Sequence, residues 1–199
     1  RTPGFSEGFK IDNTATIGIP FNLNSLKITV VGSINMDTYL NVPQLPHTGK
    51  TVITSTSSVY PGGKGINQAI GASRLGHRVT LIGNVGSDLD SDNIYRALNE
   101  NGVETHGVKR CLQTDTGKAY IFVDSNGDSM ISILTGANGI FTPQDICEKE
   151  HLFENTGYCL IQSEIPLDTM REACRMAHKY HAKTIVKPSA CSSMTREML

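Results

Sequence analysis

The chain has 199 residues, a length that fits one ordinary domain or one domain with a small addition. Its 18 basic and 19 acidic side chains give a net charge of −1, which argues against a general nucleic-acid or membrane-surface binder, because such proteins carry a basic excess. The apolar runs are strand-sized and fall short of the ~20 residues that span a bilayer. Five scattered cysteines without a CxxC pair or zinc-like spacing predict reduced thiols and a cytoplasmic protein.

Residues 1–26 differ in composition from the rest of the chain. They contain several glycines and prolines and no sustained periodicity, so we expect a tail or linker, or the end of an upstream domain. Residues 15–21 could form one short strand. The chain begins with Arg1 and ends at residues 197–199 within a helical pattern, so we expect it to be part of a longer protein.

From residue 27 onward, the sequence pattern predicts strands alternating with helices. Short runs of apolar, β-branched residues predict buried strands, and apolar residues at helical spacing followed by glycine predict helices. In chain order we expect a strand at 28–32, a strand with one wet face at 51–59, a helix at 62–76, a strand at 79–85 and a helix at 91–102.

The next section begins with a predicted hairpin and then returns to alternation. The strands 119–123 and 130–134 flank residues 124–128, which carry Asn-Gly at the tip of the turn. Thr142-Pro143-Gln144-Asp145 has the cap, the first-turn proline and the acidic residue of a helix start. A strand at 158–162, a helix at 167–181 and a strand at 184–187 complete the expected elements.

This order of elements predicts an α/β fold. Strand–helix alternation at both ends indicates a parallel sheet covered by helices. The strand 51–59 and the hairpin do not fit between those helices, so we expect them to form a small separate sheet beside the main one.

A first polar cluster, Asn35 and Asp37, follows the first strand. The two residues alternate in an extended segment, so their side chains point the same way. An amide beside a carboxylate suits the recognition of neighbouring hydroxyl groups. Taken alone, the pair would equally fit a simple turn, which both residue types favour.

A second cluster, Pro61–Ala69, opens the first long helix. Gly62 and Gly63 allow the backbone to approach a ligand closely, and a helix start offers free N–H donors. Lys64 and Asn67 share a face of the first turn. The segment is not a phosphate-binding P-loop, because Gly65 follows the lysine. A glycine-rich start needed only for packing is the alternative.

A third candidate, Glu164, lies just beyond the strand 158–162. Ligands gather at the carboxyl ends of strands in open α/β sheets, so this carboxylate would face the same rim as the first two clusters. A solvated loop carboxylate is the alternative.

Taken together, these segments resemble the N-terminal signature of ribokinase, in the PfkB family of sugar kinases. Residues 31–37 and 61–69 carry most of the resemblance, which runs from about Lys27 to Lys187. Further matching segments follow in family order: 45–52, 71–76, 82–88, 116–119, 136–138 and 162–166.

The resemblance implies a ribokinase-like fold with a small β-sheet lid, whose segments lie near 38–60 and 116–135. It implies that residues 27–199 are the N-terminal portion of such a domain, incomplete at the C-terminus, and that two subunits pair through the lid. The implied sugar contacts come from Asn35, Asp37, Gly63, Lys64, Asn67 and Glu164, with apolar contacts from the lid residues Ala119, Ile121 and Ile133.

The part of the family pattern that carries the chemistry is missing from this sequence. We find no Gly-Ala-Gly-Asp segment, so the general-base Asp is expected beyond Leu199, together with the contacts to ATP and Mg and to any monovalent cation. We also find Lys187-Pro188-Ser189-Ala190 where the family usually has Asn-Pro-Ala, which puts the local hydrogen bonding in question.

The expected function of the parent protein is the ATP-dependent phosphorylation of ribose or a closely related sugar, with this chain alone inactive. The alternatives are a catalytically inactive sugar-sensing or regulatory module, a kinase for another sugar or nucleoside, and a non-functional fragment. We expect a small-molecule sugar as partner, and neither nucleic acid nor membrane.

Overall fold

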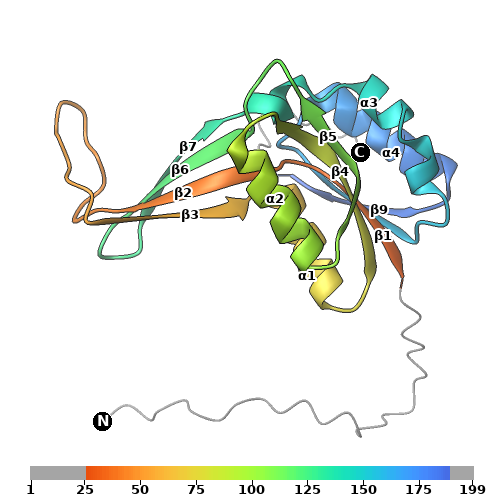
Figure 1. Cartoon of the computed structure of the whole chain (residues 1–199), viewed down its shortest axis with the longest axis horizontal. Coiled ribbons are helices and arrows are strands. Elements are labelled where there is room, and N and C mark those ends of the chain that lie inside the picture. The colour runs from red at the N-terminus through yellow and green to blue at the C-terminus, as the bar shows by residue number, and fades with distance from the viewer. Residues whose placement is uncertain (1–25, 189–199) are drawn as a thin grey trace, which may run out of the picture.

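The computed structural model describes residues 26–188, which form two β-sheets and the helices around them (Figure 1). A five-stranded sheet has the order β5-β4-β1-β8-β9, and a four-stranded sheet has the order β3-β2-β6-β7. The elements are β1 (Lys27–Val31), β2 (Asn35–Asn41), β3 (Thr56–Gly62), α1 (Lys64–Arg74), β4 (Arg78–Gly86), α2 (Leu89–Glu100), β5 (Glu104–Cys111), β6 (Gly117–Val123), β7 (Ser129–Leu134), the 3-10 helix η1 (Gly136–Ile140), α3 (Pro143–Cys147), the 3-10 helix η2 (Glu150–Phe153), β8 (Tyr158–Gln162), α4 (Leu167–Lys179) and β9 (Lys183–Lys187).

The five-stranded sheet is parallel throughout, and its central strands β1 and β4 are buried on both faces. One apolar cluster includes Val30 and Leu81 of the sheet with Ile66 of α1 and Ile94 of α2. A second cluster on the other face joins neighbouring strand residues to α3 and α4. Burial on both faces explains the nearly continuous apolar sequence of β1. The predicted parallel sheet between two layers of helices is confirmed.

The four-stranded sheet, called the lid sheet here, extends away from the helical layers (Figure 1). Strand β2 pairs antiparallel with β3 and parallel with β6, and β6 pairs antiparallel with β7. The prediction of a small separate sheet is therefore confirmed. The strand expected at 51–59 was placed too early, because residues 51–54 are irregular and β3 runs over Thr56–Gly62.

Strand β5 was not predicted. It lies at the edge of the main sheet, and its sequence ETHGVKRC shows neither an apolar run nor regular alternation. Its pairing with β4 is interrupted by a register shift between Thr80 and Ile82. The strand thus forms through hydrogen bonds to a neighbour distant in sequence, which a local pattern does not reveal.

A network around Asp88 joins the main sheet to the lid sheet. Asp88 caps α2 by accepting a hydrogen bond from Ser91 N at 2.9 Å, and also accepts from Thr116 N at 2.8 Å and Thr116 Oγ1 at 2.7 Å. Gly86 N donates to Thr116 Oγ1 at 3.0 Å. Burial raises the pKa of Asp88, but the hydrogen bonds from Thr116 and Ser91 outweigh it and lower the pKa below its ordinary value. These contacts set where β6 enters the lid sheet.

Several predictions concern residues outside the range 26–188. They are the strand at 15–21, the linker character of 1–25, the helix at 197–199 and the state of Cys191. Within the described range, the cysteines 111, 147, 159 and 174 are free thiols. None of the helices described there has the length and apolar character needed to cross a membrane.

Candidate functional site

Every residue predicted to bind the sugar lines one cavity between the lid sheet and the carboxyl ends of the main-sheet strands. The cavity has a volume of about 120 Å³. Its walls come from β2, the start of α1, the lid strands β6 and β7, and the loop after β8. The lining residues are Asn35, Asp37, Gly63, Lys64, Asn67, Ala119, Ile121, Ile131, Ile133 and Glu164.

Three side chains from three separate segments form a hydrogen-bonded chain at this cavity. Lys64 Nζ lies 2.7 Å from Glu164 Oε1, and Ser33 Oγ donates to Glu164 Oε2 at 2.8 Å. Lys64 N in turn donates to Ser33 Oγ at 3.1 Å. The sequence pattern indicated Lys64 and Glu164 but did not single out Ser33, although Ser33 belongs to the same strand end as Asn35 and Asp37.

The glycines before α1 are required by the closeness of this packing. A Cβ on Gly62 would lie 2.0 Å from Asp37 Oδ2, so a side chain there would displace the Asp37 carboxylate from its observed position. Gly63 has φ 92°, in the region that favours glycine, and a Cβ on it would lie 2.8 Å from Ser33 O. The Gly-Gly pair therefore lets the start of α1 approach both Asp37 and the end of β1.

Asp37 is the half-buried carboxylate of the cavity. Its Oδ1 is buried without a hydrogen-bond partner among residues 26–188. Burial raises the pKa of Asp37, with a smaller upward effect from the Glu164 charge, against the lowering effects of the Gly63 backbone and Lys64. A buried acceptor without a partner is the kind of group that a hydroxyl of a ligand would satisfy.

The remaining wall of the cavity is apolar and belongs to the lid sheet. Ala119 lies in register with Asp37 of β2 and with Ile133 of β7. Ile121 pairs in the same way with Ile131. Ile131 was missed as a site residue, although strand alternation from Ile133 places both side chains on one face of β7.

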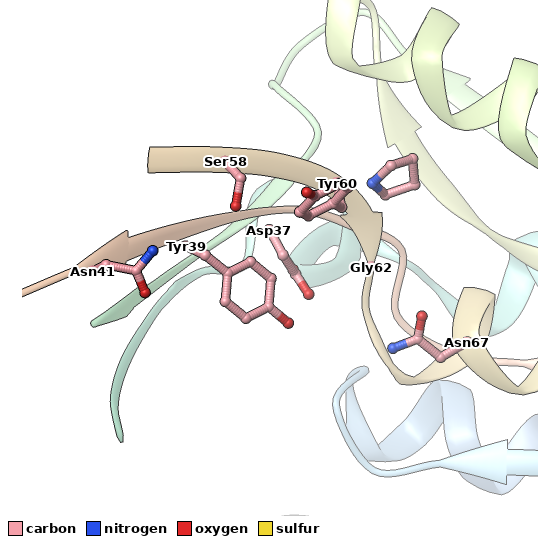
Figure 2. Close-up of a pocket in the computed structure, with 8 residues that line it drawn as sticks. Asp37, Tyr39, Asn41, Ser58, Tyr60, Gly62 and Asn67 are labelled. Atoms are coloured by element: carbon pink, nitrogen blue, oxygen red, sulfur yellow. The ribbon is translucent and has the colours of Figure 1, made fainter. Parts of the chain in front are cut away.

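The same face of the lid sheet continues into a second hollow of about 460 Å³, which shares Asp37 and Asn67 with the first. Figure 2 shows Asp37 and Tyr39 projecting from β2 toward the side where Asn67 lies. Tyr39 and Tyr60 meet edge to face with ring centroids 6.2 Å apart. The cavity at Asp37 is therefore open along the lid.

Asn138 of η1 holds the segment between β1 and β2 in place. Its Nδ2 donates to Ile34 O at 3.0 Å and to Asn35 Oδ1 at 2.8 Å, and its Oδ1 accepts from Ile34 N at 2.9 Å. Asn138 is 3% exposed. If its amide were removed, bulk water could not replace it as the hydrogen-bond partner of the Ile34 backbone and the Asn35 side chain. Asn138 thus orients Asn35, which lines the cavity.

Replacing Asn138 by alanine is expected to lower the free energy of unfolding by about 2–4 kcal/mol, because buried backbone and amide groups lose their partners. The matched control is Asn99→Ala on the exposed face of α2, which is expected to change stability by less than about 0.5 kcal/mol. Urea unfolding of both variants measures the difference. Equal stabilities would show that Asn138 does not hold this segment.

The glycine-rich start of α1 and the carboxylates around it can be examined for a metal site. Within 26–188 there is no group of three or more His, Cys, Asp or Glu side chains that could hold a metal ion. The helix start at Lys64 has the sequence GGKG, and Lys64 Nζ is engaged by Glu164.

Lys187, which stands where the resemblance would place Asn, ends β9 with an exposed side chain, and its backbone carbonyl accepts from Ser163 N at 3.4 Å.

Comparison with known proteins agrees with this geometry. The model of the pfkB family of carbohydrate kinases matches residues 25–199. A ribokinase from Bacillus subtilis is 34% identical over 172 residues, which cover 86% of this chain and 58% of that protein. A deoxyribokinase from Salmonella typhi is 31% identical over 164 residues, covering 82% of this chain and 54% of that protein.

The fold is likewise that of ribokinases. The structure of Arabidopsis thaliana ribokinase complexed with ribose and ATP matches with a TM-score of 0.72 and 30% identity, covering 81% of this chain and 53% of that one. The chain thus spans about half the length of these relatives. The sheet order, the lid and the family match together show that this chain belongs to the pfkB family of carbohydrate kinases.

Proposed function

We propose that the protein carrying this chain transfers a phosphoryl group from ATP to a hydroxyl of ribose or a closely related sugar, and that this chain supplies the acceptor-binding half and the lid. The observation that carries the proposal is the meeting of Asp37, Glu164, Lys64 and two amides at one small cavity with an apolar wall.

The chemistry of these groups fits a pentose. Asp37 and Glu164 accept hydrogen bonds from hydroxyl groups, Lys64 donates, and Asn67 can do either. Asn35 accepts from Asn138 through Oδ1, so its Nδ2 would be the group that meets the sugar. The aliphatic lid residues would cover the C–H surface of the ring and exclude water from the reacting hydroxyl.

The remaining parts of the reaction are also proposals. ATP is the proposed donor, with Mg and a monovalent cation as proposed cofactors, and the general base is proposed to lie beyond Leu199. The ribokinase from Arabidopsis thaliana, whose structure holds ribose and ATP, supports the donor and the acceptor class. The relationship to both ribokinases and a deoxyribokinase supports a pentose without choosing between the two.

We further propose that two copies of the protein pair through the lid sheet. All residues of the edge strand β7 are exposed, including the apolar residues Met130, Ile131, Ile133 and Leu134. An exposed apolar edge strand favours pairing with another chain. Light scattering on the full-length protein is expected to give the mass of a dimer.

The function is tested with the protein expressed from its complete coding sequence. ADP release is measured with ribose, 2-deoxyribose, fructose and adenosine in turn. A pentose is expected to give the highest kcat/KM. The absence of ADP release with every pentose would overturn the proposal, and saturable ribose binding by calorimetry without turnover would instead identify a sugar-sensing module.

A further inference from the structure

A second contact between α1 and the end of β8 lies beneath the Lys64–Glu164 ion pair. Gln162, the last residue of β8, donates from Nε2 to Oε1 of Gln68, one helical turn after Lys64. Gln162 is 0% exposed, and Glu164 follows it by two residues. The two side-chain contacts therefore join the same two elements, one at the cavity and one in the interior.

Missing side chains make room for the buried amide of Gln162. A Cβ on Gly32 would lie 1.5 Å from Gln162 Oε1 and 3.1 Å from Gly65 Cα. Gln162 Oε1 has no hydrogen-bond partner among residues 26–188. An apolar side chain of similar size would fill this space without leaving a buried acceptor unpaired, so the amide is not explained by packing alone.

The Lys64–Glu164 ion pair contributes little to fixing the distance between α1 and the end of β8. The side chains of Lys64 and Glu164 are 36% and 19% exposed, so salt screens their attraction. Both also line the cavity, where the hydroxyl groups of an acceptor would compete for them. The inner amide pair does not line the cavity and would persist when the ion pair is exchanged for contacts to a ligand.

We propose that Gln68 and Gln162 are positioning residues that fix the distance from Lys64 and Asn67 on α1 to Glu164 after β8 while the acceptor is bound. This inference rests on the proposed function for the identity of the acceptor. It adds a residue pair that touches no substrate and acts through the residues that do.

The test measures the Kd of ribose by calorimetry and the KM values of ribose and ATP for the full-length protein. Gln68→Met keeps the length of the half-buried side chain but removes the accepting oxygen, and is expected to weaken ribose binding about three- to tenfold. The KM of ATP is expected to stay unchanged, whereas the thermal midpoint is expected to fall, because the buried Nε2 of Gln162 loses its acceptor. Gln68→Glu keeps an accepting oxygen and is expected to restore the wild-type Kd.

A double-mutant cycle with Gln162→Met separates positioning by the pair from separate packing effects. The variant carrying both changes is expected to bind ribose no more weakly than the worse single variant, because one contact is lost in all three. An unchanged Kd in Gln68→Met, or additive losses in the double variant, would overturn the inference. If the wild-type protein binds ribose but does not phosphorylate it, only the proposed function is wrong. If the wild-type protein does not bind ribose, both the proposed function and this inference are wrong.

Discussion

Replacing Asp37 by asparagine is expected to lower kcat/KM for the sugar about 10- to 100-fold, because a hydrogen bond to a charged partner contributes about 1.5–3 kcal/mol. The loss should appear mainly in the KM of the sugar, since Asp37 lines the cavity proposed to hold the acceptor. The assay is ADP release at varied sugar and saturating ATP with the full-length protein. An unchanged KM would show that Asp37 does not contact the acceptor.

The same substitution has an opposite expected effect on stability. Burial raises the pKa of Asp37, so the folded protein binds this proton more tightly than the unfolded chain does, and the group destabilises the fold increasingly as pH rises above its unfolded pKa. The Asp37→Asn variant has no charge at this position, so it should unfold at the wild-type temperature or above it at neutral pH.

In the wild type, the KM of the sugar should rise as pH falls through the raised pKa of Asp37, and the variant should lack this rise.

The matched control is Asp168→Asn on α4. The Asp168 side chain is 77% exposed and pairs only with Arg171 one turn away among the described residues. The control should leave the KM and its pH dependence unchanged. A similar loss in both variants would point to a general charge effect instead of a contact at the cavity.

Replacing Gly65 by alanine is expected to lower the free energy of unfolding by about 1–3 kcal/mol, as overpacking of a tight core does. A Cβ at this position would lie 2.7 Å from Gly32 C and 2.7 Å from Ser33 O, and both are backbone atoms that cannot rotate away. The start of α1 would have to move, and Lys64 and Asn67 would move with it. Sugar-dependent activity should therefore fall together with stability.

Gly71→Ala in the same helix provides the matched control. A Cβ there would meet nothing within 4 Å, and the residue is exposed. Alanine favours a helix over glycine by about 0.5–1 kcal/mol, so this variant should be more stable than the wild type and fully active. Urea unfolding and ADP release measure both variants. Stabilisation by both substitutions would contradict the close packing of α1 on the end of β1.

The local pattern of the sequence was sufficient for most elements of the main sheet and for the residues at its rim. β8 was predicted at its observed bounds, and the cap of α3 was predicted from Thr142 and Asp145, which form a reciprocal capping box in the structure. Asn35, Asp37, Lys64 and Glu164 could be chosen because polar residues stood directly after buried strands or at a glycine-rich helix start. Each of these signals depends on neighbours a few residues away.

Only the tertiary structure decided which distant segments meet. Strand β5 and the partners of β2 depend on pairing across the sheets, and Asn138 reaches Ile34 across 104 residues of sequence. The buried contact between Gln68 and Gln162 and the glycines that admit it depend on how closely α1 lies on β1. Local sequence determined which side chains are candidates for binding a sugar, whereas their common cavity arises from long-range packing, whose geometry depends on all the elements at once.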